Sequence, residues 1–404
     1  MRSERFDFPN RKGEQLAATL DLPLGVPQAY ALFAHCFTCG RNILAAKRIA
    51  ERLAENGIAV LRFDFTGLGS SEGEFANTDF SSNVDDLVAA ADYLRATRSA
   101  PAILIGHSLG GAALLAAARR IPDARAVVTI AAPSDPGHVL GLFENRVEEI
   151  RARGEVEVTL AGRPFRIRRE FLDDVAERKL NDHIADLRKA LLVFHSPTDA
   201  TVGIENASQI FAAARHPKSF VSLAGADHLL SKKSDAAYVA NVVAAWAQRY
   251  LDKPVEAESE SGVVLVRETG GGKFQQEIVS GSHRLLADEP VAVGGLDSGL
   301  TPYNLLLAAL GACTAMTLRL YAEHKTLPLE RVSVRLTHNK IHAADCEDCE
   351  TREGMLDRID RNIVLEGPLD RDQRMRLIEI ANKCPVHRTL ESEINIRTFD
   401  SAPR

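Results

Sequence analysis

The stretch Ile105-Gly106-His107-Ser108-Leu109-Gly110-Gly111 places one serine between two closely spaced glycines. An apolar run, 101–105, leads into it, and an alanine-rich segment, 112–120, follows it. This order predicts a strand, a sharp turn and a helix. Small residues beside Ser108 permit a cramped turn that exposes the hydroxyl and leaves the next backbone N–H free to bind an oxyanion. We therefore interpret Ser108 as a nucleophile rather than part of an ordinary strand-to-helix turn.

The length and composition indicate a globular protein of more than one domain. The chain has 404 residues, enough for two or three domains, and 45% of them are hydrophobic. No uninterrupted apolar run approaches the roughly 18 residues that cross a bilayer. Charges are spread through residues 1–12, which therefore lack the apolar core of a secretory signal. We expect a cytoplasmic protein.

Charge and cysteine usage exclude some classes of partner. The formal net charge is −6 and there is no dense Lys/Arg block, so we expect neither nucleic acid nor membrane as a partner. The six cysteines do not suggest a disulfide framework in a cytoplasmic chain of this size. They are better interpreted as reactive, metal-binding or buried thiols.

Strand and helix patterns alternate between residues 30 and 250, which predicts a parallel sheet covered on both faces. The expected strands are 30–34, 58–63, 102–105, 126–130, 191–195 and 220–223. The alternation breaks at about 135–188, where a charged insert with one hairpin is a candidate lid. An inert surface excursion is the alternative. We assign residues 1–252 to this α/β domain.

A polar, acidic segment at 253–261 has the composition of a linker. Beyond it, residues 262–404 predict a smaller α+β domain. Its expected helices are 302–324 and 371–383, and its expected strands are 263–267, 274–279, 332–337, 363–365 and a last one near 394–397.

A serine hydroxyl needs a general base, and the base needs an acid that orients it. Asp199 follows the strand expected at 191–195, and His228 follows the next expected strand. Both follow Ser108 in the chain order serine, acid, histidine. The alternatives are Asp64 and Asp135 for the acid, and His107, His138 and His216 for the base.

Two further motifs carry a family resemblance. The segment His35-Cys36-Phe37-Thr38-Cys39 resembles the H-G-F-T-G loop of small acyl esterases, with cysteine where glycine is usual. The segment 64–71 is similar to the D-x-x-G-x-G-x-S element. With the serine motif, these make residues 1 to about 250 resemble the α/β-hydrolase family, in its cinnamoyl-esterase and serine-aminopeptidase-like branch. The resemblance implies that the backbone N–H groups of Phe37 and Leu109 form the oxyanion hole. It implies a small ester, thioester or amide substrate.

Two cysteines in the second domain carry another resemblance. The helix pattern T-P-x-x-x-L-x-x-A-L-x-x-C ends at Cys313, and C-P-V-H-R begins at Cys384. Together they resemble the OsmC/Ohr-type thiol peroxidases. The resemblance implies that an organic hydroperoxide oxidises Cys313 to a sulfenic acid and that Cys384 resolves it as a disulfide. A thiol reductant would then restore both, and a homodimer through this domain is implied.

The same resemblance implies an arginine that activates Cys313, for which Arg267 and Arg284 are candidates. Tyr303 stands where such peroxidases often have glutamate. A dimerisation or redox-sensing module without peroxide turnover is therefore the alternative. Neither chemistry requires a cofactor.

Two C-x-x-C pairs give weaker signals. Cys346 and Cys349, with His338 and His342 upstream, could bind zinc, but the spacing fits no common zinc motif and favours a solvated acidic loop. For the pair at 36 and 39 we expect a packing or local role. We therefore predict no metal site.

Overall fold

The computed structural model describes residues 1–160, 162–177, 179–251, 262–281, 283–343 and 353–400. They belong to two units, Met1–Glu258 and Ser259–Arg404. The linker predicted at 253–261 lies outside the described residues.

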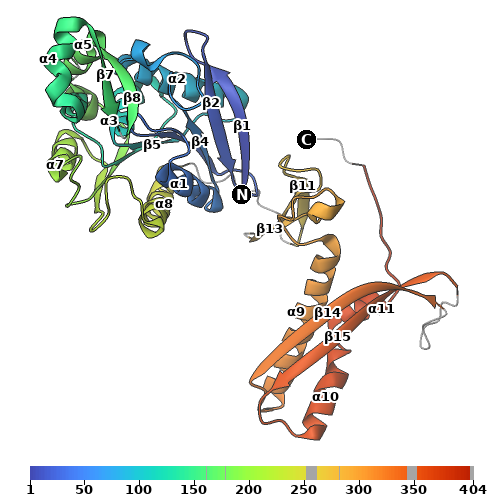
Figure 1. Ribbon diagram of the computed structural model, residues 1–404. Helices are drawn as coiled ribbons and strands as arrows, with labels where there is room; N and C mark the ends of the chain where they lie inside the picture. Colours follow the sequence, from blue (N-terminus) through green and yellow to red (C-terminus); the bar gives the residue numbers. More distant parts are fainter. Residues whose placement is uncertain (161, 178, 252–261, 282, 344–352, 401–404) are drawn as a thin grey trace. The chain divides into compact units, whose positions relative to one another are not determined.

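An eight-stranded sheet forms the centre of the first unit (Figure 1). Its order is β1 (Arg2–Pro9), β2 (Gln15–Leu22), β4 (Ile58–Phe63), β3 (Ala29–Ala34), β5 (Ile103–His107), β6 (Ala126–Ile130), β9 (Ala190–His195) and β10 (Lys218–Ser222). The first two strands pair antiparallel, and the strands from β4 to β10 run parallel. Strands β4, β5, β6 and β9 are buried along their whole length, as expected for strands covered on both faces.

Helices cover both faces of this sheet. On one face α1 (Leu44–Glu55) packs with α8 (Lys233–Ala247). The other face carries α2 (Phe80–Thr97), α3 (Leu109–Ala117) and α7 (Ile204–Ala213). The short helices η1 (Phe75–Asn77) and η2 (Ala118–Arg120) complete this layer. The predicted α/β class with a mostly parallel sheet is confirmed.

The predicted insert consists of η3 (Pro136–Arg146), α4 (Val147–Arg153), β7 (Glu155–Leu160), β8 (Arg163–Arg168), α5 (Arg169–Glu177) and α6 (Leu180–Ala185). Strands β7 and β8 pair as the expected antiparallel hairpin. Phe171, Leu172 and Val175 of α5 are buried in the same apolar cluster as α2 and α3. The insert therefore contributes to the core of the unit, and its elements lie together in Figure 1.

The second unit is α+β, as predicted. A three-stranded antiparallel sheet joins β11 (Leu265–Glu268), β12 (Gln276–Ser280) and β13 (His283–Ala287), and η4 (Val291–Val293) follows it. Helix α9 (Pro302–His324) lies against the long hairpin of β14 (Arg331–His342) and β15 (Met355–Glu366). Helices α10 (Arg371–Ala381) and α11 (Pro385–Glu391) pack on α9.

The strand predicted near 394–397 is wrong for the described chain. These residues form no regular element, and Ile394 and Ile396 are 51% and 82% exposed. The alternating apolar pattern is present, but a strand also needs a neighbouring edge with which to exchange backbone hydrogen bonds.

Helix α9 is long and apolar enough, by length and composition alone, to cross a membrane. The sequence was expected to contain no segment apolar enough to cross a bilayer, and α9 corrects this expectation. Small and weakly polar residues interrupt its apolar run without making the helix polar. Core helices of other folds meet the same criterion. In this unit Leu318 and Ala322 of α9 are buried against α10.

Candidate active sites

Ser108 occupies a strained turn between β5, which ends at His107, and α3, which begins at Leu109. Its φ of 54° and ψ of −129° are unusual for a non-glycine residue. A Cβ atom at Gly106 would lie 2.4 Å from the Cα of Gly111, and one at Gly110 would lie 2.3 Å from the carbonyl oxygen of His35. The glycines are needed because neighbouring backbone occupies the space of any side chain.

The structure brings Ser108, His228 and Asp199 into one hydrogen-bonded chain. His228 Nε2 lies 3.0 Å from Ser108 Oγ, and His228 Nδ1 lies 2.8 Å from Asp199 Oδ2. The loop after β9 carries the aspartate and the loop after β10 carries the histidine, so both lie at the carboxyl ends of adjacent strands. Because a carboxylate only accepts, Nδ1 holds the proton and Nε2 is free to accept from the serine hydroxyl.

Asp199 is held as an anion although its side chain is fully buried. Its Oδ1 accepts hydrogen bonds from the backbone N–H groups of Thr201 at 2.8 Å and Val202 at 3.0 Å. Burial raises the pKa of this carboxyl, but the hydrogen bonds from His228 and from the loop outweigh burial, and the net shift is downward. The ionised form can therefore stabilise a charged imidazolium.

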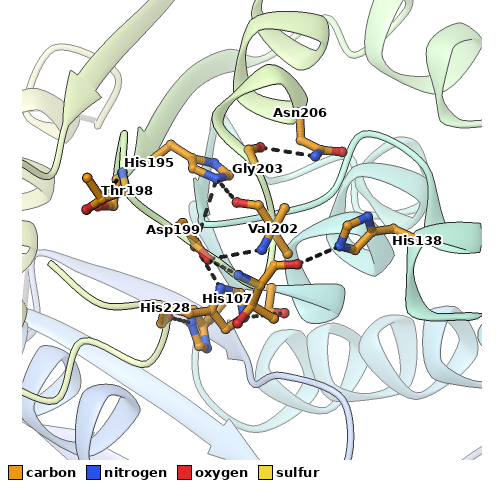
Figure 2. Close-up of polar contacts among 12 residues, drawn as sticks. His107, His138, His195, Thr198, Asp199, Val202, Gly203, Asn206 and His228 are labelled. Atoms are coloured by element: carbon orange, nitrogen blue, oxygen red, sulfur yellow. Dashed lines mark hydrogen bonds and ion pairs between the residues drawn. The ribbon is translucent and has the colours of Figure 1, made fainter. Parts of the chain in front are cut away.

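Two histidines brace the loop that carries Asp199 (Figure 2). His138, from η3 of the insert, donates from Nε2 to the carbonyl oxygen of Thr201 at 2.8 Å. His195, at the end of β9, donates to the carbonyl oxygen of Val202 at 2.7 Å. His138, an alternative base in the sequence, therefore has a structural contact. The role of His195 was missed, although its position four residues before Asp199 was a usable signal.

His107 braces the loop of the base in the same way. Its Nε2 donates to the carbonyl oxygen of His228 at 2.7 Å, and the two rings lie 5.3 Å apart. Burial lowers the pKa of His107 to about 4, so the ring stays neutral and keeps this bond near neutral pH.

The remaining alternatives for the acid and the base make other contacts or lie in other loops. Asp64 accepts from the backbone N–H of Arg41 at 2.5 Å and also pairs with that guanidinium. Asp135 caps η3 by accepting from the backbone N–H of Gly137 at 2.7 Å. His216 is exposed in the loop before β10. The carboxylate that reaches His228 is therefore Asp199.

The predicted oxyanion loop, 35–40, adjoins the serine turn. Strands β3 and β5 pair with Ala34 opposite Gly106, so the loop leaves the sheet beside the serine. Leu109 is the first residue of α3, and its N–H has no acceptor within the helix. The ring of Phe37 stacks on Phe171 of the insert with centroids 5.5 Å apart. The geometry is suited to two donors on one side of Ser108.

Cys36 and Cys39 form a disulfide within this loop, with Cα atoms 5.4 Å apart. The pair has a local role, as expected, but the interpretation of the cysteines as reactive, metal-binding or buried thiols is wrong for these two. The turn of the chain at 36–39 brings the two Cα atoms within the range that a disulfide spans, about 4.4–6.8 Å. Spacing alone did not reveal this turn.

The second site contains the predicted cysteine pair. Cys313 lies in α9, and Cys384 is the buried N-cap residue of α11. Cys384 Sγ accepts from the backbone N–H of His387 at 3.3 Å and from Thr314 Oγ1 at 3.7 Å. Burial raises the pKa of Cys384, but the hydrogen bonds to its sulfur outweigh burial, and the net shift is downward. The packing of α11 on α9 brings the two elements that carry the cysteines together.

The two predicted arginines pair with Glu277 within the chain. Arg267 Nε lies 2.8 Å from Glu277 Oε2, and Arg284 Nη1 lies 2.9 Å from Oε1. They flank β12 from strands β11 and β13. Activation of Cys313 across a dimer concerns a second chain and stays a prediction.

Arg361 of β15 is the functional candidate that the sequence reasoning missed. Its Nη1 donates to Thr314 Oγ1 at 3.0 Å and to the carbonyl oxygen of Ala381 at 3.2 Å. Thr314 in turn contacts Cys384. The hairpin register places this arginine, and no local motif surrounds it.

The weak zinc candidate is only partly described, since Cys346 and Cys349 lie outside the described residues. His338 stacks on Tyr303 with ring centroids 4.3 Å apart and bonds to Asp357 at 2.8 Å. Among the residues that the structure describes, no group of three metal-ligating side chains occurs.

Comparison with known families now places the chain. Residues 31–294 match the family described as "Alpha/beta hydrolase family". The chain belongs to the alpha/beta hydrolase family. Residues 295–399 match the family described as "OsmC-like protein", so the chain is a fusion of two families. The hydrolase match extends to residue 294, whereas the structure assigns 259–294 to the second unit.

Similar proteins support the same family. A crystal structure of an esterase domain from a Rhodothermus marinus protein is 52% identical, with a TM-score of 0.52, and covers 62% of this chain and 99% of that one. A mouse protein, palmitoyl-protein thioesterase ABHD10, mitochondrial, is 28% identical over 50% of this chain and 70% of its own length. Est1E from Butyrivibrio proteoclasticus with ferulic acid bound shares the fold, at 20% identity and a TM-score of 0.50, over 61% of this chain and 100% of its own.

Substituting Gly110 with alanine should strongly destabilise the first unit. The added Cβ would meet the backbone oxygen of His35, which cannot move without displacing β3. We expect the free energy of unfolding to fall by about 3 kcal/mol in a denaturant titration. Gly141, whose added Cβ would meet nothing within 4 Å, is the matched control, and Gly141→Ala should change stability by less than about 0.5 kcal/mol. Equal effects would refute the steric argument.

His107 should make stability depend on pH between its unfolded and folded pKa values, 6.5 and about 4. In this range the unfolded chain binds more protons, so the free energy of unfolding contributed by His107 rises with pH by about 1 kcal/mol per unit. The contribution is complete above pH 6.5 and is lost as pH falls towards 4. Denaturant titrations at several pH values should show this slope as the difference between wild type and His107→Gln. A difference that is flat with pH would contradict it.

Proposed function

We propose that the first unit is a serine hydrolase in which Ser108 is the nucleophile, His228 the general base and Asp199 the residue that orients and stabilises the base. The observation that supports this most is the continuous chain of hydrogen bonds from Ser108 Oγ through the imidazole to a buried carboxylate. This arrangement activates a hydroxyl that is otherwise a poor nucleophile.

In the proposed reaction Ser108 Oγ attacks the carbonyl carbon while His228 Nε2 takes the hydroxyl proton. The carbonyl oxygen becomes an oxyanion, which the backbone N–H groups of Leu109 and Phe37 stabilise. The imidazolium then gives its proton to the leaving group, and the acyl group stays on Ser108. In the second step His228 takes a proton from water, which attacks the acyl carbon. The imidazolium then returns the proton to Ser108 Oγ, and the carboxylic acid product leaves.

We propose a small ester, thioester or amide as the substrate, with acyl-sulfur or acyl-oxygen bonds favoured. The lining of a narrow recess beside the oxyanion loop is largely apolar, which favours an apolar acyl group on this side of the site: Phe37, Phe65, Leu68, Phe75 and Leu109. Two of the similar proteins, an esterase domain and a palmitoyl-protein thioesterase, support this class.

Ser108→Ala should abolish hydrolysis of p-nitrophenyl acetate, with kcat falling roughly 10⁴-fold or more because no other nucleophile is positioned. Asp199→Asn should lower kcat to a similar extent by favouring the wrong imidazole tautomer. Circular dichroism would verify that both variants fold. Asp135→Asn, which changes a helix cap outside the proposed triad, is the matched control. Substantial hydrolysis by Ser108→Ala would sink the proposal.

We propose a second activity for the OsmC-like unit, the reduction of organic hydroperoxides. Cys313 thiolate would attack the distal peroxide oxygen, which yields a sulfenic acid and an alcohol. Cys384 would displace hydroxide from that sulfur to form a disulfide, and an external dithiol would reduce it. The observation favouring this pair is the packing of α11 on α9, which carry the two cysteines, and the two donors to Cys384 Sγ.

The alternative is that this unit senses oxidants or mediates dimerisation without turnover. It rests on Tyr303, whose ring stacks on His338 where a glutamate is expected to orient an arginine. We also propose a homodimer through this unit and a cytoplasmic location. Large exposed apolar side chains on its helix and sheets suit a dimer interface: Val264, Val266, Leu285, Met316, Leu320 and Val364.

Cys313→Ser should abolish peroxide consumption in the presence of dithiothreitol while Ser108→Ala retains it. Cumene hydroperoxide loss, followed over many equivalents, would distinguish the peroxidase from the sensor. Repeated turnover supports the peroxidase, and a single equivalent consumed per chain supports the sensor.

Arg361→Gln should slow the reaction roughly tenfold if its contact with Thr314 helps to position Cys384. Unchanged peroxide consumption by Cys313→Ser would contradict both the peroxidase and the sensor proposals.

A further inference from the structure

The disulfide between Cys36 and Cys39 encloses Phe37, the residue whose backbone N–H is assigned to the oxyanion hole. We propose that this pair is a reversible redox site that exchanges electrons with a dithiol and that its oxidation state sets the turnover of the hydrolase. This inference rests on the proposed serine hydrolase. The oxidised pair corresponds to the active form.

The disulfide and the turn hydrogen bond join the same two residues. Cys39 N–H donates to the carbonyl oxygen of Cys36 at 3.2 Å, which closes a four-residue turn. The peptide between Cys36 and Phe37 is planar and trans, so its C=O and N–H point in opposite directions. Fixing the Cys36 carbonyl towards Cys39 therefore also fixes the direction of the Phe37 N–H.

Thr38 lies in this turn in a backbone conformation that is unfavourable for threonine. Thr38 has a φ of 60° at the third turn position, which usually takes glycine or asparagine. A β-branched residue is particularly disfavoured there. The covalent link helps to hold Thr38 in this conformation, and after reduction hydrogen bonds alone would have to do so.

After reduction only noncovalent contacts hold the loop. Phe37 stacks on Phe171, and Arg163 of the insert hydrogen-bonds to the carbonyl oxygen of Thr38. His35 Nδ1 also donates to the carbonyl oxygen of Cys36 at 2.8 Å, so after reduction this bond and the turn hydrogen bond hold the peptide between Cys36 and Phe37 without a covalent link. We therefore expect reduction to misalign one oxyanion donor and leave the unit folded.

The two sulfurs differ in access, which indicates the order of exchange. Cys36 is 5% exposed, whereas Cys39 is half-buried. A dithiol thiolate would attack Cys39 Sγ, form a mixed disulfide and release Cys36 as a thiolate that takes up a proton. The second thiol of the reductant would then displace Cys39, so that two electrons and two protons pass to the pair and the reductant becomes a disulfide. In a reducing compartment such disulfides are typically catalytic or redox-sensing.

The test is a redox titration of the full-length protein in buffers of reduced and oxidised dithiothreitol. We expect kcat for p-nitrophenyl acetate to fall at least tenfold on reduction, with KM changing less than threefold, because one oxyanion donor is lost. Alkylation and peptide mass mapping should give the same midpoint for the Cys36–Cys39 pair, and reoxidation should restore kcat. Full reduction of the pair with kcat within twofold of the oxidised enzyme would overturn the proposal. A pair that never forms, or never yields to dithiothreitol, would overturn it equally.

Variants separate the switch from general damage. C36S/C39S should fold and have the kcat of the reduced enzyme, and its kcat should not change when dithiothreitol is added. Thr38→Gly should lose most of the dependence on reduction, because glycine adopts a positive φ without the disulfide. C313S/C384S should keep the full response, which assigns it to the first unit. Loss of the response in that variant would refute the assignment. Ser108→Ala tests the underlying hydrolase in the oxidised protein, so the two failures are distinguishable.

Discussion

Backbone crowding around Ser108 is the constraint on which the first unit depends. Gly106 lies against Gly111, and Gly110 lies against the carbonyl oxygen of His35, so β5, α3 and the end of β3 meet without intervening side chains. This contact forces the unusual backbone of Ser108 and places the oxyanion loop beside it. The adjacent parallel strands then bring the acid and the base to the same edge of the sheet. The steric contact thus sets the positions of Ser108 and of the loop beside it, and the strand order sets those of Asp199 and His228.

The site uses histidine in two ways that sequence alone cannot separate. His228 contacts a hydroxyl and a carboxylate, which suits proton transfer. His107, His138 and His195 each donate to a backbone carbonyl and hold the loops of the base and the acid. The partner decides between these uses, because a carbonyl oxygen only accepts and the ring nitrogen that faces it must donate; at His107 burial also keeps the imidazole neutral.

The cysteines show the same dependence on surroundings. Cys36 and Cys39 are joined because a turn brings them together, whereas Cys313 and Cys384 come from elements 71 residues apart (384 − 313) that meet when α9 and α11 pack. Within the described chain Arg361 reaches Thr314 beside Cys384, because hairpin register, not a motif, positions it, and the roles predicted for Arg267 and Arg284 stay predictions. The strand expected at 394–397 is absent from the described residues because apolar alternation does not supply a pairing edge.

Local sequence determined the buried parallel strands, the serine turn, the order of serine, acid and histidine, and the change to a second, α+β unit. These features depend on period, small residues and chain order, all of which are present in the linear sequence. Tertiary structure alone decided which histidines brace loops, which arginine contacts Thr314 beside Cys384, and that Cys36 and Cys39 are bonded. Each of these depends on the distance and burial of side chains that folding brings together, and neither quantity is written in the order of residues.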